Sequence, residues 1–176
     1  MSALTIAGLG KIYRGKKLQK VTALVGLDLE VSVGEVFGFL GPNGAGKSTT
    51  IKSIMNLIQP TTGSILVAGT PSTDPASRQK IGFLPENPSF FDFMTAREYL
   101  AFVGSAYQME PSKLKKESER VLALLDLTQA ADRLIRGYSK GMVQRLGLAQ
   151  ALVHDPDLYI LDEPMSGLDP IGRALV

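Results

Sequence analysis

The sequence contains no cysteine and only one histidine, His154, among its 176 residues. Without cysteine the chain cannot form disulfides, thiolate zinc sites or a cysteine nucleophile, and nothing indicates an oxidising compartment. With a single imidazole it cannot form a metal site that needs several histidines. These absences favour a cytoplasmic protein whose chemistry depends on other side chains.

Charge and hydropathy exclude further classes of protein. Nineteen basic and 17 acidic side chains leave a net charge of +2, which is too small to indicate binding to nucleic acid. No apolar run approaches the roughly 18 to 20 residues that span a bilayer, and the first residues lack the layout of a secretory signal. Because 44% of the residues are hydrophobic and 20% are charged, we expect a folded globular chain with one domain.

The hydrophobic pattern predicts an α/β protein. Residues 4–9 and 22–33 are expected to be strands, and from Val25 onward apolar side chains alternate with polar ones, which indicates one solvent-facing side. The continuous apolar run Val36–Leu40 is typical of a parallel strand buried on both faces. A crossover helix should follow over residues 47–57. Further short strands are expected at residues 64–67, 81–84 and 158–161.

The middle of the chain is expected to be helical. Thr95 and Glu98 have the spacing of a capping box, so a helix should begin there. A second helix is indicated at residues 112–127, where apolar residues lie on one stripe and charged residues on the other. A third helix is expected at residues 141–153. His154 follows it and is interpreted as a helix-terminal surface residue.

A glycine-rich motif lies between the expected buried strand and the crossover helix. Its pattern, G-x-x-x-x-G-K-[ST], is typical of a loop whose backbone N–H groups surround phosphate oxygens at a helix N-terminus. Lys47 can then reach the terminal phosphates, and Ser48 offers a hydroxyl to Mg²⁺. A plain glycine-rich turn is the alternative, which the flanking elements disfavour. The motif comprises Gly41, Pro42, Asn43, Gly44, Ala45, Gly46, Lys47 and Ser48.

Two acidic residues follow the last expected strand. Asp162 ends the apolar run of residues 158–161 and lies where ligands of open α/β sheets collect, so it is placed to hold Mg²⁺ through water. Glu163 comes next, and its carboxylate can accept a proton from, or orient, the water that attacks a γ-phosphate. A strand end that meets solvent is the alternative interpretation of this pair.

Residues 138–145, Tyr-Ser-Lys-Gly-Met-Val-Gln-Arg, resemble the signature sequence of ATP-binding-cassette (ABC) ATPases. The resemblance extends over essentially the whole chain and is greatest to ATPase subunits of bacterial ABC-2-type exporters. It implies an α/β P-loop NTPase (RecA-like) core with an N-terminal antiparallel β subdomain and an inserted α-helical subdomain. The corresponding segments of one ABC ATPase domain are residues 1–87, with the Walker A core, 88–155, with the signature, and 156–176, with Walker B and the D-loop.

The resemblance also implies roles for individual residues. It assigns catalysis to Glu163, Lys47 and Glu86, the last at the Q-loop position. It assigns Mg²⁺ to Ser48, Asp162 and Glu86. ATP would contact the Walker A residues from Gly41 to Ser48, together with Thr49, Tyr13 stacked on the adenine, Ser139 and Gly141 of the signature, and Asp169 of the D-loop.

The family mechanism implies two partners. A second ATPase subunit, identical or different, would face the first head to tail, with each nucleotide between Walker A of one and the signature of the other. A separate transmembrane permease subunit would hold the cassette at the cytoplasmic face of the membrane and convert ATP-driven closure into export. No nucleic acid partner is expected.

The chain departs from the family pattern at several positions. Glu86 stands where the family usually has glutamine, Lys140 replaces a signature glycine, and Met142 replaces the signature glutamine. The switch histidine expected beyond Walker B does not occur before Val176. The resemblance therefore implies a cassette truncated at its C-terminus, which should hydrolyse ATP slowly or not at all.

Other interpretations stay open. A soluble ABC ATPase acting on DNA or ribosomes would carry long coiled-coil insertions or a second cassette, and neither is visible. A nucleotide-binding module without hydrolysis is a further alternative, whereas a generic P-loop kinase or GTPase leaves residues 139–142 unexplained.

Two groups of residues each allow two interpretations. A cluster of five cations fits either contacts with anionic lipids or a solvated turn: Lys11, Arg14, Lys16, Lys17 and Lys20. Four aromatic residues fit a docking surface or buried packing: Phe83, Phe90, Phe91 and Phe93.

Overall fold

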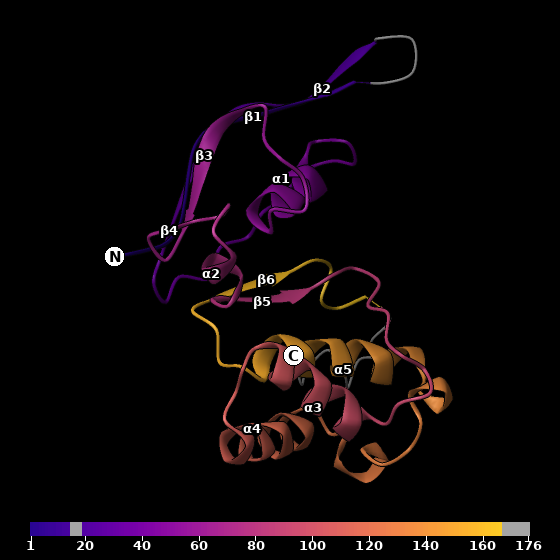
Figure 1. The fold of residues 1–176 in the computed structure, drawn as a ribbon. Helices are drawn as coiled ribbons and strands as arrows, with labels where there is room; N and C mark the ends of the chain where they lie inside the picture. Colours follow the sequence, from indigo (N-terminus) through magenta and orange to yellow (C-terminus); the bar gives the residue numbers. More distant parts are fainter. Residues whose placement is uncertain (15–18, 167–176) are drawn as a thin grey trace. The chain divides into compact units, whose positions relative to one another are not determined.

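The computed structural model of the chain describes residues 1–14 and 19–166. The chain forms two compact units, Met1–Ile81 and Gly82–Val176 (Figure 1). The expected single domain, with subdivisions near residues 87 and 155, stays a prediction. Within the described residues, no helix is long and apolar enough to cross a membrane.

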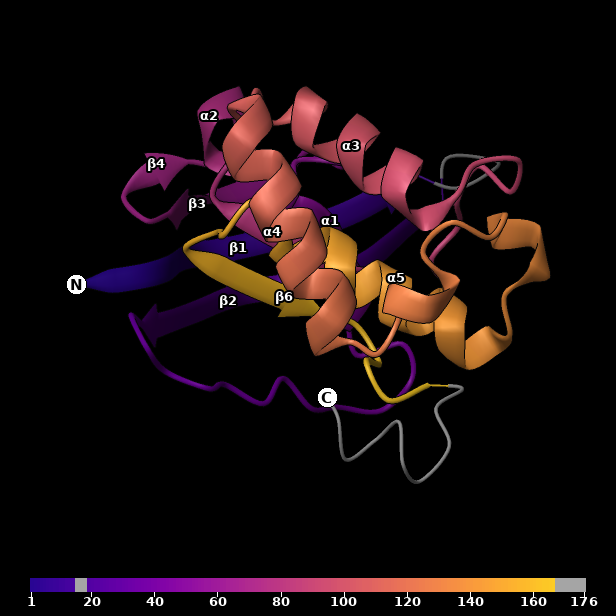
Figure 2. The ribbon, with the colours of Figure 1, turned by 90° about the horizontal axis from the view of Figure 1, so that it is seen from below.

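The first unit is built on an antiparallel sheet of four strands in the order β2-β1-β3-β4. Strand β1 is central because Leu4 pairs with Val31 on one side and with Val67 on the other. Figure 2 shows β1 and β2 running side by side. The elements of this unit are β1 (Ser2–Arg14), β2 (Lys20–Ser32), α1 (Lys47–Ile54), β3 (Thr62–Val67), β4 (Thr70–Pro71) and α2 (Pro75–Arg78).

A bulge changes which face of β2 is buried. The strand pairing shifts register between Leu9 and Lys11, and Gly26 has a φ of +58°. As a result Leu24 is only 9% exposed, whereas Val25 is 85% exposed. The predicted alternation of apolar residues is therefore wrong at Val25 and is followed from Leu27 to Ser32. The reason is that an extra residue in a strand moves the following side chains to the other face.

The apolar run Val36–Leu40 is not a strand in the structure, so the prediction of a buried parallel strand there is wrong. Val36 is 99% exposed and Leu40 is 91% exposed. A central parallel strand needs a hydrogen-bonded neighbour on each side and cover on both faces. Among residues 1–14 and 19–166, no strand pairs with this segment, so its hydrophobic pattern alone does not fix its structure.

Up to residue 166, where the described part of the chain ends, the second unit contains three α-helices and a two-stranded sheet of β5 and β6. The predicted strand at residues 158–161 is confirmed without change, and the predicted helices are confirmed with ends shifted by a few residues. The elements are β5 (Ile81–Leu84), α3 (Ala96–Ala106), α4 (Pro111–Leu124), the 3₁₀ turns η2 (Thr128–Ala130) and η3 (Ile135–Gly137), α5 (Lys140–Leu152) and β6 (Leu158–Leu161).

Helices α3, α4 and α5 share one hydrophobic core. Leu100, Leu122 and Leu146 are completely buried, one from each helix. Gly104 allows α3 to approach α4 closely, because a Cβ at this position would overlap the side chain of Leu114. This core fixes the direction of α5, the helix that begins with the signature residues.

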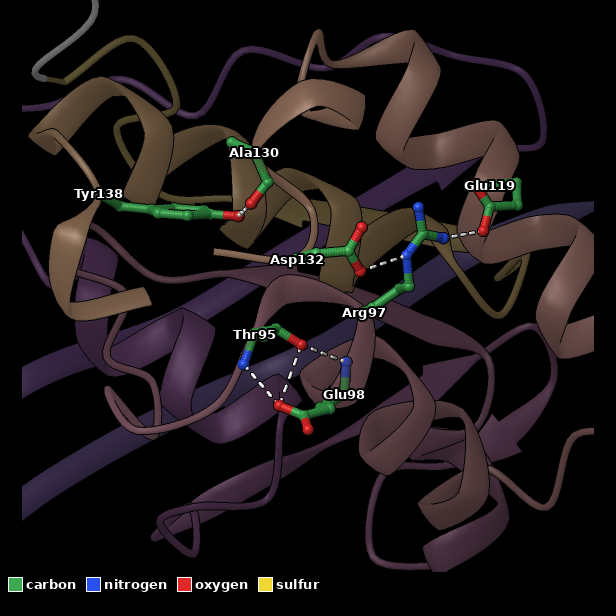
Figure 3. Close-up of polar contacts among 7 residues, drawn as sticks. All are labelled: Thr95, Arg97, Glu98, Glu119, Ala130, Asp132 and Tyr138. Atoms are coloured by element: carbon green, nitrogen blue, oxygen red, sulfur yellow. Dashed lines mark hydrogen bonds and ion pairs between the residues drawn. The ribbon is translucent and has the colours of Figure 1, made fainter. Parts of the chain in front are cut away.

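Polar contacts fix the start of α3 (Figure 3). The predicted capping box is confirmed: Thr95 Oγ1 accepts a hydrogen bond from Glu98 N, and Glu98 Oε2 accepts one from Thr95 N over 2.8 Å. Arg97, two residues later, forms ion pairs with Glu119 and with Asp132, the latter over 2.9 Å. These contacts tie α3 to α4 and to the segment that leads to α5.

His154 is half-buried rather than a free surface residue. It follows α5 as predicted, but its ring stacks on that of Tyr107, with 3.7 Å between ring centroids and an angle of 10° between the planes. The sequence interpretation was right about the helix end and wrong about the exposure of His154. The ring that covers His154 belongs to Tyr107, at the C-terminal end of α3.

Candidate nucleotide-binding site

The glycine-rich loop of the first unit ends at the N-terminus of α1. Gly44 and Gly46 have φ values of +85° and +94°, in the left-handed region that glycine adopts at little cost. Gly46 is the N-cap of α1 and brings no side chain to the N–H groups of the first turn. The structure thus leaves the first-turn N–H groups of α1 without a capping side chain, as a phosphate-binding loop requires.

Lys47 lies over this loop. Its Nζ donates hydrogen bonds to the carbonyl oxygens of Gly41, over 2.6 Å, and of Pro42, over 3.1 Å. Ala45 N also donates to Pro42 O over 3.1 Å, which closes the turn. The ammonium group is therefore already held at the loop that the sequence identified, and neighbouring Ser48 is exposed in the first helical turn.

Tyr13 lies beside the same helix. Its hydroxyl oxygen is 3.4 Å from Oγ1 of Thr49, which belongs to the first turn of α1. Lys11 Nζ lies 5.2 Å from the centroid of the Tyr13 ring and donates a hydrogen bond to Gln59 O. The first unit thus brings Tyr13 next to Thr49 at the N-terminal end of α1, although the two residues are distant in sequence.

The second unit carries the acidic residues and the signature. Asp162 follows β6, and its backbone N–H donates to Leu84 O over 2.9 Å, next to the end of β5. Glu163 is exposed and has a φ of +54°. The carboxylates therefore follow a hydrogen-bonded strand end, as predicted, and the backbone turns sharply at the second one.

Ser139 is the N-cap of α5. Its Oγ accepts a hydrogen bond from Met142 N over 3.3 Å, and Gly141 lies in the first turn. Tyr138, just before the cap, donates its hydroxyl to Ala130 O over 2.7 Å (Figure 3). Burial raises the pKa of the Tyr138 hydroxyl. The signature residues therefore form a second well-fixed helix N-terminus.

The sequence analysis missed the side chain that connects these two parts. Gln144 Nε2 donates to the carbonyl oxygens of Glu163, over 3.4 Å, and of Pro164, over 3.2 Å. Gln144, Leu148 and Ala151 are spaced i, i+4 and i+7 and are all buried. A polar residue on this apolar helix face was the available signal.

The remaining predicted site residues have less structural context. Glu86 is exposed, two residues after β5. Asp169 lies outside the described residues. The described part of the chain contains no group of three or more acidic, histidine or cysteine side chains placed to hold a metal ion. The oxygens of Ser48 and Asp162 are still of the kind that Mg²⁺ prefers, so the donor chemistry fits this ion.

A lysine-covered glycine loop at a helix N-terminus and a carboxylate pair after a strand define a P-loop nucleotide-binding protein of the α/β class. The family model described as ABC transporter matches residues 24–166. The chain therefore belongs to the ABC transporter family.

Known relatives cover nearly all of the chain. An ABC transporter ATP-binding protein of Synechocystis sp. is 45% identical in an alignment that covers 96% of this chain and 49% of the relative. The Nod factor export ATP-binding protein I of Rhizobium meliloti is 39% identical over 99% of this chain and 51% of its own length. The chain thus spans about half the length of the curated relatives it matches.

A solved structure confirms the fold class. The ATP binding subunit of an ABC transporter superposes with a TM-score of 0.88 at 31% identity, over 98% of this chain and 71% of that chain. The α/β P-loop NTPase fold expected from the sequence is therefore confirmed.

Gly46 should be the least replaceable glycine of the loop. A Cβ at Gly46 would lie 2.5 Å from Leu24 Cδ2 and 2.8 Å from Ala23 O, whereas a Cβ at Gly44 would meet nothing within 4 Å. Both positions carry the backbone strain of a left-handed residue, about 1 to 2 kcal/mol. We expect Gly46→Ala to lower the free energy of unfolding by about 1 kcal/mol or more beyond the effect of Gly44→Ala. Urea unfolding of both variants measures this difference, and equal losses would contradict it.

Proposed function

We propose that this chain is the ATP-binding and ATP-hydrolysing part of an ABC transporter subunit that drives export through a separate transmembrane permease. The observation that carries the proposal is the loop at the start of α1, where Lys47 Nζ is held by two loop carbonyls. The export direction is supported by the likeness to a protein named for Nod factor export.

The first unit supplies the groups that would bind ATP. The phosphates would lie in the loop from Gly41 to Ser48, since its glycine conformations and open helix end favour anions. Lys47 would exchange its bonds to loop carbonyls for bonds to the terminal phosphates. Tyr13 would stack on the adenine, and its contact with Thr49 supports a place next to the phosphate loop.

The second unit supplies the groups that would hydrolyse ATP. The water oxygen bonds to the γ-phosphorus as the bond from that phosphorus to the β–γ bridging oxygen breaks, which yields ADP and phosphate. Glu163 would accept the proton of this water. Ser48, Asp162 and Glu86 are the residues that would hold Mg²⁺, and this ion would supply positive charge that neutralises the phosphates.

Ser139 and Gly141 would act on the nucleotide of a second ATPase subunit. The N-terminus of α5 favours anions for the same reason as that of α1, because N–H groups and the positive end of the helix dipole meet there. A γ-phosphate bound by one subunit could thus bridge to the signature of the other. The proposed arrangement is a head-to-tail pair in which Asp169 of the D-loop also takes part.

The proposed permease would dock on the exposed aromatic residues of the second unit. The ring of Phe91 lies tilted against that of Phe93 and edge-to-face with that of Phe102, with 5.7 and 5.6 Å between ring centroids, and all three residues are exposed. Phe90 instead contacts Tyr99 at 4.9 Å within the core. Docking here would place the subunit at the cytoplasmic face of the membrane.

Tyr13→Ala should weaken ATP binding about tenfold or more, because base–aromatic stacking contributes about 1 to 3 kcal/mol. Tyr13→Phe is the matched control, since it keeps the ring and loses only the hydroxyl that lies near Thr49. Equilibrium binding of ATP to the full-length protein measures both variants. Unchanged affinity in Tyr13→Ala would remove this residue from the adenine site.

Glu163→Gln should keep ATP affinity and lower turnover at least about a hundredfold, because an amide cannot accept the proton of the attacking water. The ATP-bound pair should then persist on a sizing column. Glu30→Gln, the same change at an exposed position of β2, is the control and should turn over ATP normally. Steady-state ATPase assays of the full-length protein decide this, and wild-type turnover in Glu163→Gln would move the catalytic role elsewhere.

A further inference from the structure

Gln144 is a polar residue in the interior of the second unit. It is only 3% exposed and lies on α5, five residues after the cap Ser139. Its amide nitrogen points at the backbone of the loop after β6, with Glu163 O at 3.4 Å and Pro164 O at 3.2 Å. A buried amide that spans from a helix to a loop costs free energy unless its bonds are made, so this contact requires an explanation.

The loop that Gln144 holds has a strained conformation. Glu163 is not a glycine, yet its φ is +54°. A left-handed conformation of this kind costs about 1 to 3 kcal/mol and persists only where neighbouring groups impose it. Besides Gln144, Ser166 N donates to Glu163 O over 2.9 Å. These donors fix the carbonyl side of the residue and therefore the direction in which its exposed carboxylate leaves the backbone.

We propose that Gln144 is a positioning residue that holds the Glu163 carboxylate in its working direction and connects it to the N-terminus of α5. The inference rests on the proposed function, in which Glu163 accepts the proton of water and Ser139 contacts the nucleotide of the second subunit. In that arrangement, one buried side chain links the hydrolysis site of a subunit to its contact with the nucleotide of the partner. A shift of α5 at that contact would be transmitted to Glu163 and Pro164 through the hydrogen bonds that Gln144 donates to their carbonyl oxygens.

Two variants remove the contact by different means. Gln144→Met keeps the length of the side chain and removes the donor, whereas Gln144→Asn keeps the amide and shortens its reach. Either change should lower kcat of the full-length protein about ten- to a hundredfold, since a misplaced catalytic group is this costly. ATP affinity should stay within about twofold, because neither Lys47 nor the phosphate loop is touched. The Asn variant preserves the test if the Met variant does not fold.

Arg145→Met is the matched control. Arg145 is the next residue of α5, and its guanidinium also donates to backbone carbonyls, those of Leu125 and Asp126, at 3.0 and 3.1 Å. Leu125 and Asp126 lie directly after α4, so these bonds do not involve the loop after β6 that contains Glu163. The control should lower the melting temperature, as loss of a helix contact does, and leave kcat close to that of the wild type.

A double-mutant cycle with Glu163→Gln separates positioning from a general structural role. If Gln144 acts through the carboxylate, Gln144→Met should lower the residual turnover of Glu163→Gln less than about twofold, because the group it positions is already gone. An equal fall in both backgrounds would overturn the inference. Reduced turnover in Glu163→Gln together with normal turnover in both Gln144 variants would overturn the inference about Gln144 and leave the proposed catalytic role of Glu163 standing. Full turnover in Glu163→Gln would instead overturn the proposed catalytic role and the inference with it.

Discussion

Backbone N–H groups in the first turn of a helix have no partner within the helix, and the proposed site is built on this constraint. The N-cap of α1 is Gly46, which offers these groups no side chain. The N-cap of α5 is Ser139, an exposed residue whose Oγ accepts a hydrogen bond from Met142 N. Ser139 accepts with its oxygen, so its O–H proton can still be donated to a phosphate. The two helix ends thus differ in their caps: α1 has no capping side chain, which suits primary binding of phosphate, and α5 has a serine hydroxyl, which suits a bridging contact with the nucleotide of the second subunit.

Lys47 contributes to the shape of the loop. Its ammonium group needs hydrogen-bond acceptors, and the carbonyls of Gly41 and Pro42 provide them within the loop. A neutral carbonyl is a weaker partner for an ammonium group than a charged phosphate, because only the phosphate adds attraction between opposite charges. Exchange of these partners would therefore favour binding while the loop stays in place. The loop packs closely against β2 at Gly46, since Leu24 and Ala23 leave no room for a side chain there.

Local signals predicted much of the fold and of the site. The capping box of Thr95 and Glu98 and the strand Leu158–Leu161 depend on short-range chemistry, and both are confirmed. The phosphate loop could be recognised because its glycines serve local backbone angles. The run Val36–Leu40 could not be assigned from pattern alone, since a buried strand depends on neighbours that no local sequence specifies. Gln144 was missed for a related reason: its bonds go to residues that are distant in sequence.

Complementation between defective subunits tests the central claim, a composite nucleotide site, most directly. Full-length Lys47→Ala and Ser139→Ala proteins would be mixed, subunit exchange followed by fluorescence, and ATP turnover measured. In a mixed pair both defects fall on one of the two sites, so the other site keeps an intact loop and an intact signature. The account predicts turnover well above the sum of the two proteins measured alone. Demonstrated exchange without any gain in turnover would contradict it.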